Sequence, residues 1–250
     1  MAKPKFIELA DEVRIPILYE DRSIIAIDKP SGWMLIPNSW DKTDRNLQLA
    51  IQSSIQAGDY WARSRQLRSL RYIHRLDAET TGVMLFGKSP GAVNTYSQLF
   101  ADRCVEKIYL AVVATIPSKK DWICREKLSA EPNAQGRRFV DPQYGKEAET
   151  HFRVVQTQPP FALIEARPTT GRTHQIRLHL LASGLTILHD PLYALGNEMP
   201  ARPRGELALR AVSLSYQDPF QRRRIRIMAP TDDFLSRYGF RSAPDKQPPS

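Results

Sequence analysis

Asp77 is the residue of this 250-residue chain best placed to do chemistry. It follows His74 and Arg75 and precedes an apolar run at residues 83–86, so the chain turns beside the carboxylate and then enters a strand. A loop held by rigid structure is a common position for a functional side chain. An Asp at a turn can equally cap that turn or pair with a surface arginine. If Asp77 is functional, its carboxylate would act as a nucleophile and must stay ionised.

Two further residues are suited to assist such a carboxylate. Arg177 lies among leucines and isoleucines, where a buried guanidinium would need a carboxylate partner. Pairing with Arg177 would keep Asp77 ionised, although Arg177 could also be a surface residue of a helix. Tyr109 lies on a strand predicted at residues 107–114, where a core aromatic is the simpler interpretation.

The spacing of the other polar residues does not favour metal or nucleotide chemistry. The five histidines form no HxxxH pair, and Cys104 and Cys124 form no CxxC motif and have no histidine close in sequence. The patterns GxxxxGK[ST] and GxSxG, typical of phosphate-binding loops and of serine hydrolases, are absent. We therefore expect neither a metal nor a cofactor.

The charge of the chain favours a polyanionic partner. Lys and Arg number 36 against 27 Asp and Glu, a formal net charge of +9. Much of the excess lies in two clusters, which are Arg63, Arg65, Arg68, Arg71 and Arg75, and Arg222, Arg223, Arg224 and Arg226. These clusters are either solvated surface or a nucleic-acid interface.

The same composition indicates where the protein works. No apolar run is long enough to cross a bilayer, and the first residues lack the apolar core of a signal peptide. Two cysteines do not make a disulfide framework, which fits a reducing compartment. We expect a cytoplasmic monomer with no membrane contact.

The elements predicted around these residues combine into a sheet with helices packed on it. Strands are predicted at residues 15–28, as a hairpin, and at 107–114, 150–155, 161–166, 207–216 and 225–228. Helices are predicted at residues 47–55, from Ser89 and Pro90 onward, and at 169–184. Because hairpins outnumber strand-helix-strand crossovers, the fold class is α+β, with a mixed, mainly antiparallel central sheet flanked by helices and loops.

Three motifs, in this order, resemble those of the RluA-type pseudouridine synthases. They are His74-Arg75-Leu76-Asp77 followed by Thr80-Thr81-Gly82, then Lys107-Ile108-Tyr109, then Gly-Arg-Thr-His-Gln-Ile-Arg-Leu-His-Leu at residues 171–180. Segments at residues 28–32, 145–150 and 190–193 are also similar to that family, so the resemblance covers about residues 15–230. The chain departs from the family at Thr81, where serine is frequent, and at His189 and Ala194, where glycine is more usual.

The resemblance implies a pseudouridine synthase fold with a catalytic cleft. It also implies isomerisation of uridine in ribosomal or transfer RNA, after base flipping and without a cofactor or metal. Asp77 would be the attacking carboxylate, Tyr109 would lie against the target base and help to remove its C5 proton, and Arg177 would hold Asp77 ionised.

The resemblance also implies four substrate-binding residues. His74 and Arg75 would lie beside the flipped nucleotide, with Arg75 as the wedge that fills the gap in the base stack. Arg172 and His174 would lie near the RNA backbone. Any of the four could instead brace the cleft.

We expect an N-terminal extension at residues 1–14, a catalytic domain at 15–240 and a flexible tail at 241–250. Two other functions fit the same residues. One is a catalytically inactive RNA-binding or ribosome-assembly protein with this fold. The other is a cofactor-free nuclease that uses His and Arg and would cleave the strand.

Overall fold

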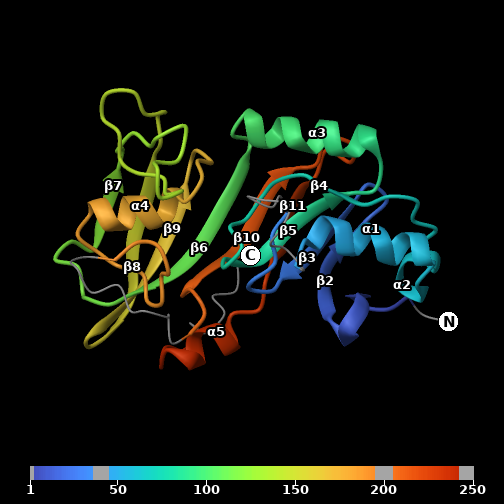
Figure 1. Ribbon diagram of the computed structural model, residues 1–250, viewed down its shortest axis with the longest axis horizontal. Coiled ribbons are helices and arrows are strands. Elements are labelled where there is room, and N and C mark those ends of the chain that lie inside the picture. The colour runs from blue at the N-terminus through green and yellow to red at the C-terminus, as the bar shows by residue number, and fades with distance from the viewer. Residues whose placement is uncertain (1–2, 36–44, 195–204, 242–250) are drawn as a thin grey trace.

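The structure, a computed structural model, describes residues 3–35, 45–194 and 205–241. Within these residues one sheet of eleven strands runs through the molecule (Figure 1). Its strands are β1 (Phe6–Glu8), β2 (Arg14–Glu20), β3 (Ile24–Lys29), β4 (Arg71–Tyr72), β5 (Thr81–Gly87), β6 (Val105–Val113), β7 (Asp121–Cys124), β8 (Thr150–Gln158), β9 (Phe161–Pro168), β10 (Leu209–Gln217) and β11 (Arg224–Met228). The order is β1-β2-β3-β5-β10-β6-β9-β8-β7, while β11 pairs with β10 and β4 with β5.

The helices lie against this sheet and at its ends. They are η1 (Ala10–Glu12, a 3-10 turn), α1 (Leu47–Ala57), α2 (Tyr60–Arg63), α3 (Pro90–Ala101), α4 (Gln175–Ala182) and α5 (Asp232–Arg237). In Figure 1, α1 lies over the N-terminal half of the sheet and α4 over the half formed by β8 and β9. None of the helices in the described part of the chain combines the length and the apolar character that a membrane crossing requires.

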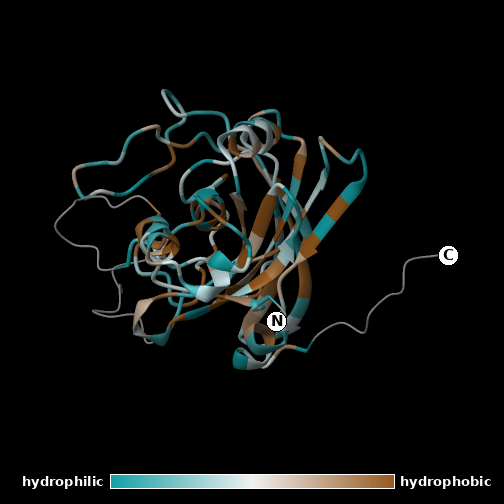
Figure 2. Ribbon diagram, turned by 90° about the vertical axis from the view of Figure 1, so that its right-hand side faces the viewer, coloured by the Kyte–Doolittle hydropathy of each residue, from teal (hydrophilic) through white to brown (hydrophobic). Residues whose placement is uncertain are grey.

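The central strands are buried on both faces, which explains their continuous apolar sequence. Met84 and Phe86 of β5 belong to the core that includes residues of α1 and α4, while Val83 and Leu85 belong to the core beneath α3. Hydrophobic residues are concentrated along these strands (Figure 2). The sheet is therefore a rigid support for the loops that leave its central strands.

The predicted mixed, mainly antiparallel sheet is confirmed. Only β5 and β10, among the described pairs, run parallel, at Thr81 and Gly82. Gly82 has φ +110°, and a Cβ there would collide with the backbone of Ala211 on β10. Glycine thus lets the two strands meet directly after the loop that carries Asp77.

Several local predictions are confirmed. β2 and β3 form the expected hairpin, and β8 and β9 pair across Pro159 and Pro160. Ser89 caps α3 by accepting a hydrogen bond from the Ala92 N–H, with Pro90 at the first helical position. Residues 1–14, expected as an extension, include β1, which pairs with β2. The tail predicted at residues 241–250 lies, after residue 241, outside the described residues.

The helix predicted at residues 169–184 is wrong at its start, because α4 begins only at Gln175. The Gln175 side chain accepts a hydrogen bond from the Thr170 hydroxyl at 2.7 Å and donates to the Glu149 carbonyl at 2.9 Å. These bonds hold residues 169–174 as a loop against the start of β8. The loop ends at His174, whose φ of +57° is left-handed.

Candidate active site

Asp77 lies in the loop between β4 and β5, and its side chain is 22% exposed. The facing residue is Arg177 of α4, whose side chain is fully buried. Arg177 Nη1 donates to Asp77 Oδ2 at 3.4 Å, a contact that joins residues a hundred positions apart in the chain. The structure therefore brings together the two side chains that the sequence analysis paired.

The stronger partner of Arg177 is Asp190, to which the sequence analysis gave no role. Arg177 Nε and Nη2 donate to the two Asp190 oxygens at 2.8 and 2.6 Å, a bidentate pair with almost no solvent exposure. Asp190 Oδ1 also accepts the backbone N–H groups of Leu192 and Tyr193 at 2.9 and 3.0 Å. Asp190 thus fixes the plane of the guanidinium and leaves Nη1 directed at Asp77.

Within the described residues, Arg177 contacts three carboxylates. Glu79 Oε2 lies 3.6 Å from Arg177 Nη1, beside Asp77. Burial alone lowers the pKa of Arg177, but its bonds to Asp190 and the charges of Asp77 and Glu79 outweigh burial and raise it. The guanidinium is therefore a permanent positive charge at the site.

Lys29 holds the Asp77 loop in place through hydrogen bonds. It was not predicted as a site residue. Its side chain is completely buried at the end of β3, and Nζ donates to the carbonyls of Pro30, Ala78 and Thr80 at 3.0, 2.8 and 2.9 Å. Burial lowers the pKa of Lys29 to about 8, against the opposing charges of Asp77 and Glu79. The amine is protonated at neutral pH, and its three donors match three carbonyls.

Replacing Lys29 by Met should loosen this loop. Met fills similar space but leaves the three carbonyls without their donor, and each buried unsatisfied group costs about 1–3 kcal/mol. We expect a melting temperature lower by several degrees and a larger loss of turnover than of RNA affinity. Lys127→Met, which removes an exposed ion pair with Glu147, is the matched control and should change neither. Equal melting temperatures for both variants would contradict the anchoring role.

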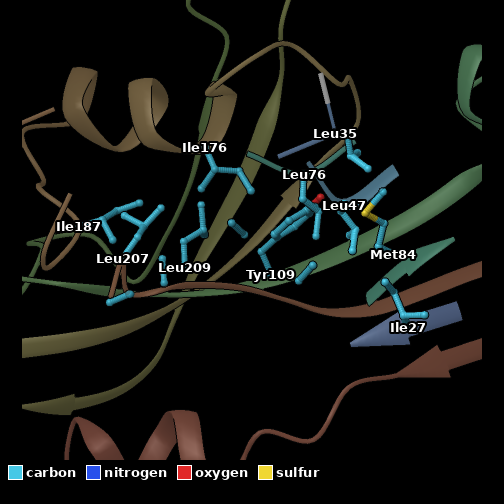
Figure 3. Close-up of a cluster of buried hydrophobic side chains, with 14 of the residues drawn as sticks. Ile27, Leu35, Leu47, Leu76, Met84, Tyr109, Ile176, Ile187, Leu207 and Leu209 are labelled. Carbon is cyan, nitrogen blue, oxygen red and sulfur yellow. The ribbon is translucent and has the colours of Figure 1, made fainter. Parts of the chain in front are cut away.

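Tyr109 lies on β6, with 9% of its surface exposed. Its ring packs among Leu47, Leu76 and Met84 (Figure 3). Burial and, to a lesser degree, the charge of Asp77 raise the pKa of Tyr109. The phenol is therefore neutral. A neutral phenol is suited to packing against the target uracil but not to removing a proton, because only the phenolate would be a strong proton acceptor.

His74 and Arg75 point to different surroundings. The His74 ring stacks on Phe100 of α3, with centroids 4.5 Å apart, and Nε2 accepts the Leu85 N–H at 3.1 Å. Burial, together with the charge of Lys107, lowers the pKa of His74 to about 3, so the ring is neutral. Arg75 is exposed, and its side chain has no hydrogen-bond or ion-pair partner within the described residues. The surroundings of His74 favour bracing, whereas Arg75 is free to meet a ligand.

His174 and Arg172 lie in the loop that precedes α4. His174 Nδ1 is 2.8 Å from the Tyr193 hydroxyl, and Nε2 is 3.9 Å from Asp77 Oδ1. Arg172 is exposed, and its Nε donates to the Glu147 carbonyl at 3.0 Å. His174 is thus beside the Asp77 carboxylate, closer to the reacting group than a residue that binds the RNA backbone needs to be.

The arginine clusters are only partly free. The Arg65 side chain is buried and paired with Glu20 at 2.8 Å, and Arg224 pairs with Glu106 at 2.5 Å. The remaining arginines of the first cluster are all exposed, and they are Arg63, Arg68, Arg71 and Arg75. The last arginine of this cluster, Arg75, is two residues before Asp77 in the sequence.

Sequence reasoning therefore anticipated the contact between Asp77 and Arg177 but not the contacts that Lys29, Asp190 and Tyr193 make around them. The segments that hold these three residues, 28–32 and 190–193, were noted only as similar to a family. The available signal was the buried arginine itself, which needs more than one partner. In the described part of the chain, no three His, Cys, Asp or Glu side chains are grouped to hold a metal ion.

Comparisons with known proteins point to one family. A family model described as RNA pseudouridylate synthase matches residues 23–182. Pseudouridylate synthase RPUSD2 of Mus musculus is 34% identical over 191 residues, which are 76% of this chain and 32% of that protein. Ribosomal large subunit pseudouridine synthase C of Haemophilus ducreyi is 30% identical over 228 residues, which are 90% of this chain and 68% of that protein.

The fold also has a solved relative. The structure of human RNA pseudouridylate synthase domain containing 1 superposes with a TM-score of 0.68 at 21% identity, covering 86% of this chain and 83% of that one. This likeness concerns the fold alone. The chain spans about a third of the length of the mouse protein, so activities of the whole relatives do not transfer to it without a test.

Proposed function

This chain belongs to the RNA pseudouridylate synthase family, and from that membership we propose that it isomerises uridine to pseudouridine in RNA, with Asp77 as the nucleophile. One observation carries the role of Asp77. Its partly exposed carboxylate lies 3.4 Å from a fully buried arginine that Asp190 holds in place. A carboxylate so placed is oriented and reachable.

The reaction balances without a cofactor. The bond between uracil N1 and ribose C1′ breaks, a bond between C5 and C1′ forms, C5 loses a proton and N1 gains one. Asp77 would hold the reaction partners together, by adding to the ring or by assisting departure from the sugar. Tyr109 would pack against the base while it turns, and Arg177 would keep Asp77 ionised and directed.

A uridine within a base stack must first be turned out, at a cost of a few kcal/mol. Arg75, exposed and two residues from Asp77, is the candidate to fill the vacated gap. The exposed arginines of the first cluster would contact the backbone of the RNA. Relatives are named as ribosomal large subunit enzymes, so ribosomal RNA is the first substrate to test, followed by transfer RNA. We expect a cytoplasmic monomer.

A tritium-release assay tests this function. RNA labelled with tritium at uracil C5 loses the label when C5 bonds to C1′, so the purified protein should release tritium from unmodified ribosomal RNA. The inactive RNA-binding alternative predicts binding without release. The nuclease alternative predicts shortened strands on a gel. No release from either ribosomal or transfer RNA would overturn the proposal.

Replacing Arg75 by Ala should impair a folded substrate more than an unfolded one. The wedge offsets the cost of unstacking, and a short unstructured oligonucleotide has little stacking to lose. We expect kcat/KM to fall about 10-fold or more on a hairpin and less than about threefold on the linear strand with the same uridine. Arg14→Ala, which removes an exposed pair with Glu8, is the control. An equal loss on both substrates would remove Arg75 from base flipping.

A further inference from the structure

His174 and Asp77 face each other across a gap. Nε2 of His174 lies 3.9 Å from Asp77 Oδ1, too far for a hydrogen bond, and both side chains are partly exposed, at 16% and 22%. The other ring nitrogen, Nδ1, is bound to the Tyr193 hydroxyl at 2.8 Å. Nε2 is thus the nitrogen that is free to meet a ligand beside the carboxylate.

The ring of His174 is held firmly in this orientation. Tyr193 contacts it edge to face at 5.5 Å, and the Tyr193 hydroxyl is in turn within 3.2 Å of both the N–H and the carbonyl of Arg138. The backbone of His174 has the left-handed φ of +57°, which is uncommon for a residue other than glycine. A ring that was only a space filler would not require these restraints.

The gap is suited to a hydroxyl group. Burial lowers the pKa of His174 and the charge of Arg177 adds to this, while Asp77 opposes it, so the imidazole is neutral at neutral pH. Its Nε2 donates or accepts according to the tautomer, whereas the carboxylate only accepts. When Nδ1 accepts the proton of the Tyr193 hydroxyl, Nε2 carries the ring proton. A hydroxyl can then accept from Nε2 and donate its one proton to Asp77, with its oxygen about 2.8 Å from both atoms. An N–H group, which only donates, cannot bridge this Nε2–H and the carboxylate.

We propose that His174 and Asp77 together bind the ribose 2′-hydroxyl of the target nucleotide, and that His174 thereby makes the site prefer RNA to DNA. This inference rests on the proposed function, in which Asp77 acts beside the bond between N1 and C1′. The 2′-hydroxyl is on the carbon next to C1′, whereas the uracil N3–H lies across the ring. The 2′-hydroxyl is also the group that distinguishes RNA from DNA at a given site.

A cycle of two changes tests this contact. The substrates are a short RNA centred on a uridine that the enzyme isomerises, and the same strand with 2′-deoxyuridine at that position. The variant is His174→Asn, because Asn tolerates a left-handed backbone. We expect each single change to lower kcat/KM by about 10- to 100-fold. For the His174→Asn variant, kcat/KM on the deoxy strand should be less than about threefold below its kcat/KM on the RNA strand.

The inference would be overturned if the fold losses in kcat/KM from the two changes multiplied in full. It would also be overturned if the wild-type enzyme had the same kcat/KM on both strands. His151→Asn, which alters an exposed histidine paired with Glu149, is the control and should behave like wild type. Equal melting temperatures of the variants exclude a merely structural effect.

Binding gives a readout that does not depend on turnover. The dissociation constants of the same two strands should differ for wild type and be nearly equal for His174→Asn. If the wild type binds the RNA strand more tightly but never isomerises it, the proposed function fails and the contact stands. If isomerisation is observed and the cycle shows no coupling, the contact fails and the function stands.

Discussion

Asp77→Asn should abolish isomerisation, with turnover reduced by about 10⁴-fold or more, while RNA affinity changes only a few-fold. The amide keeps the size of the carboxylate and still accepts a hydrogen bond from Arg177 Nη1, now 3.4 Å from Asp77 Oδ2. It cannot act as a nucleophile. Tritium release measures turnover, and filter binding measures affinity for the same RNA.

Glu79→Gln is the matched control for this result. Glu79 loses a negative charge beside the same guanidinium, at 3.6 Å from Arg177 Nη1, but it has no assigned part in bond formation. Its turnover should stay within about 10-fold of wild type. If Glu79→Gln were as inactive as Asp77→Asn, the loss would reflect the charge balance of the site instead of a nucleophile.

Arg177→Ala should damage both stability and activity. It leaves Asp190, whose side chain is 1% exposed, without its bidentate partner, and an unpaired buried charge costs about 3–5 kcal/mol. For a chain of this size such a loss lowers the melting temperature by roughly 10 °C. Urea unfolding and a thermal scan would measure it. Turnover should fall at a temperature where the variant is still folded, because Asp77 loses its facing cation.

Arg237→Ala is the control, since Arg237 makes an exposed pair with Glu206 that should contribute little to stability. The double variant Arg177→Met with Asp190→Leu separates the two effects. An apolar pair removes the unpaired charge, so part of the stability should return while turnover does not. An unchanged melting temperature in Arg177→Ala would show that the buried pair is not formed as described.

Local pattern predicted those parts of the fold that depend on neighbours in sequence. The apolar run at residues 83–86 gave β5, and Ser89 with Pro90 gave the start of α3. The turn before β5 made Asp77 a candidate. A carboxylate between a basic run and a buried strand can be recognised from a short stretch of sequence. The apolar residues around Arg177 suggested a buried cation that needs a carboxylate partner, and the family resemblance pointed to the same pair.

Contacts between distant segments were not predictable in the same way. Lys29 donates to the carbonyl of Thr80, which is 51 residues later in the sequence. The sequence of its own strand does not show that the amine binds three carbonyls. Asp190 meets Arg177 through a turn whose preceding residue, His189, has a positive φ, where the family more often has glycine. The spacing of apolar residues predicts which face of a helix is buried. It does not predict which side chain of a distant loop contacts that helix.

The start of α4 shows the same limit. The helix was predicted to start at the Thr and Gly residues of 169–171, yet the side chain of Gln175 bonds to Thr170 and Glu149 and holds residues 169–174 as a loop. His174 consequently reaches Asp77 from the left-handed end of the loop and not from a helix face. The hydrogen bond to the Glu149 carbonyl joins two segments that no local sequence window contains.

The most direct test is a pseudouridine map, at nucleotide resolution, of RNA from cells that lack this protein and from cells that regain either wild type or Asp77→Asn. The proposed function predicts that one or a few uridines lose their modification in the deletion, and that wild type restores them while the Asn variant does not. An unchanged map in the deletion, or restoration by Asp77→Asn, would contradict it.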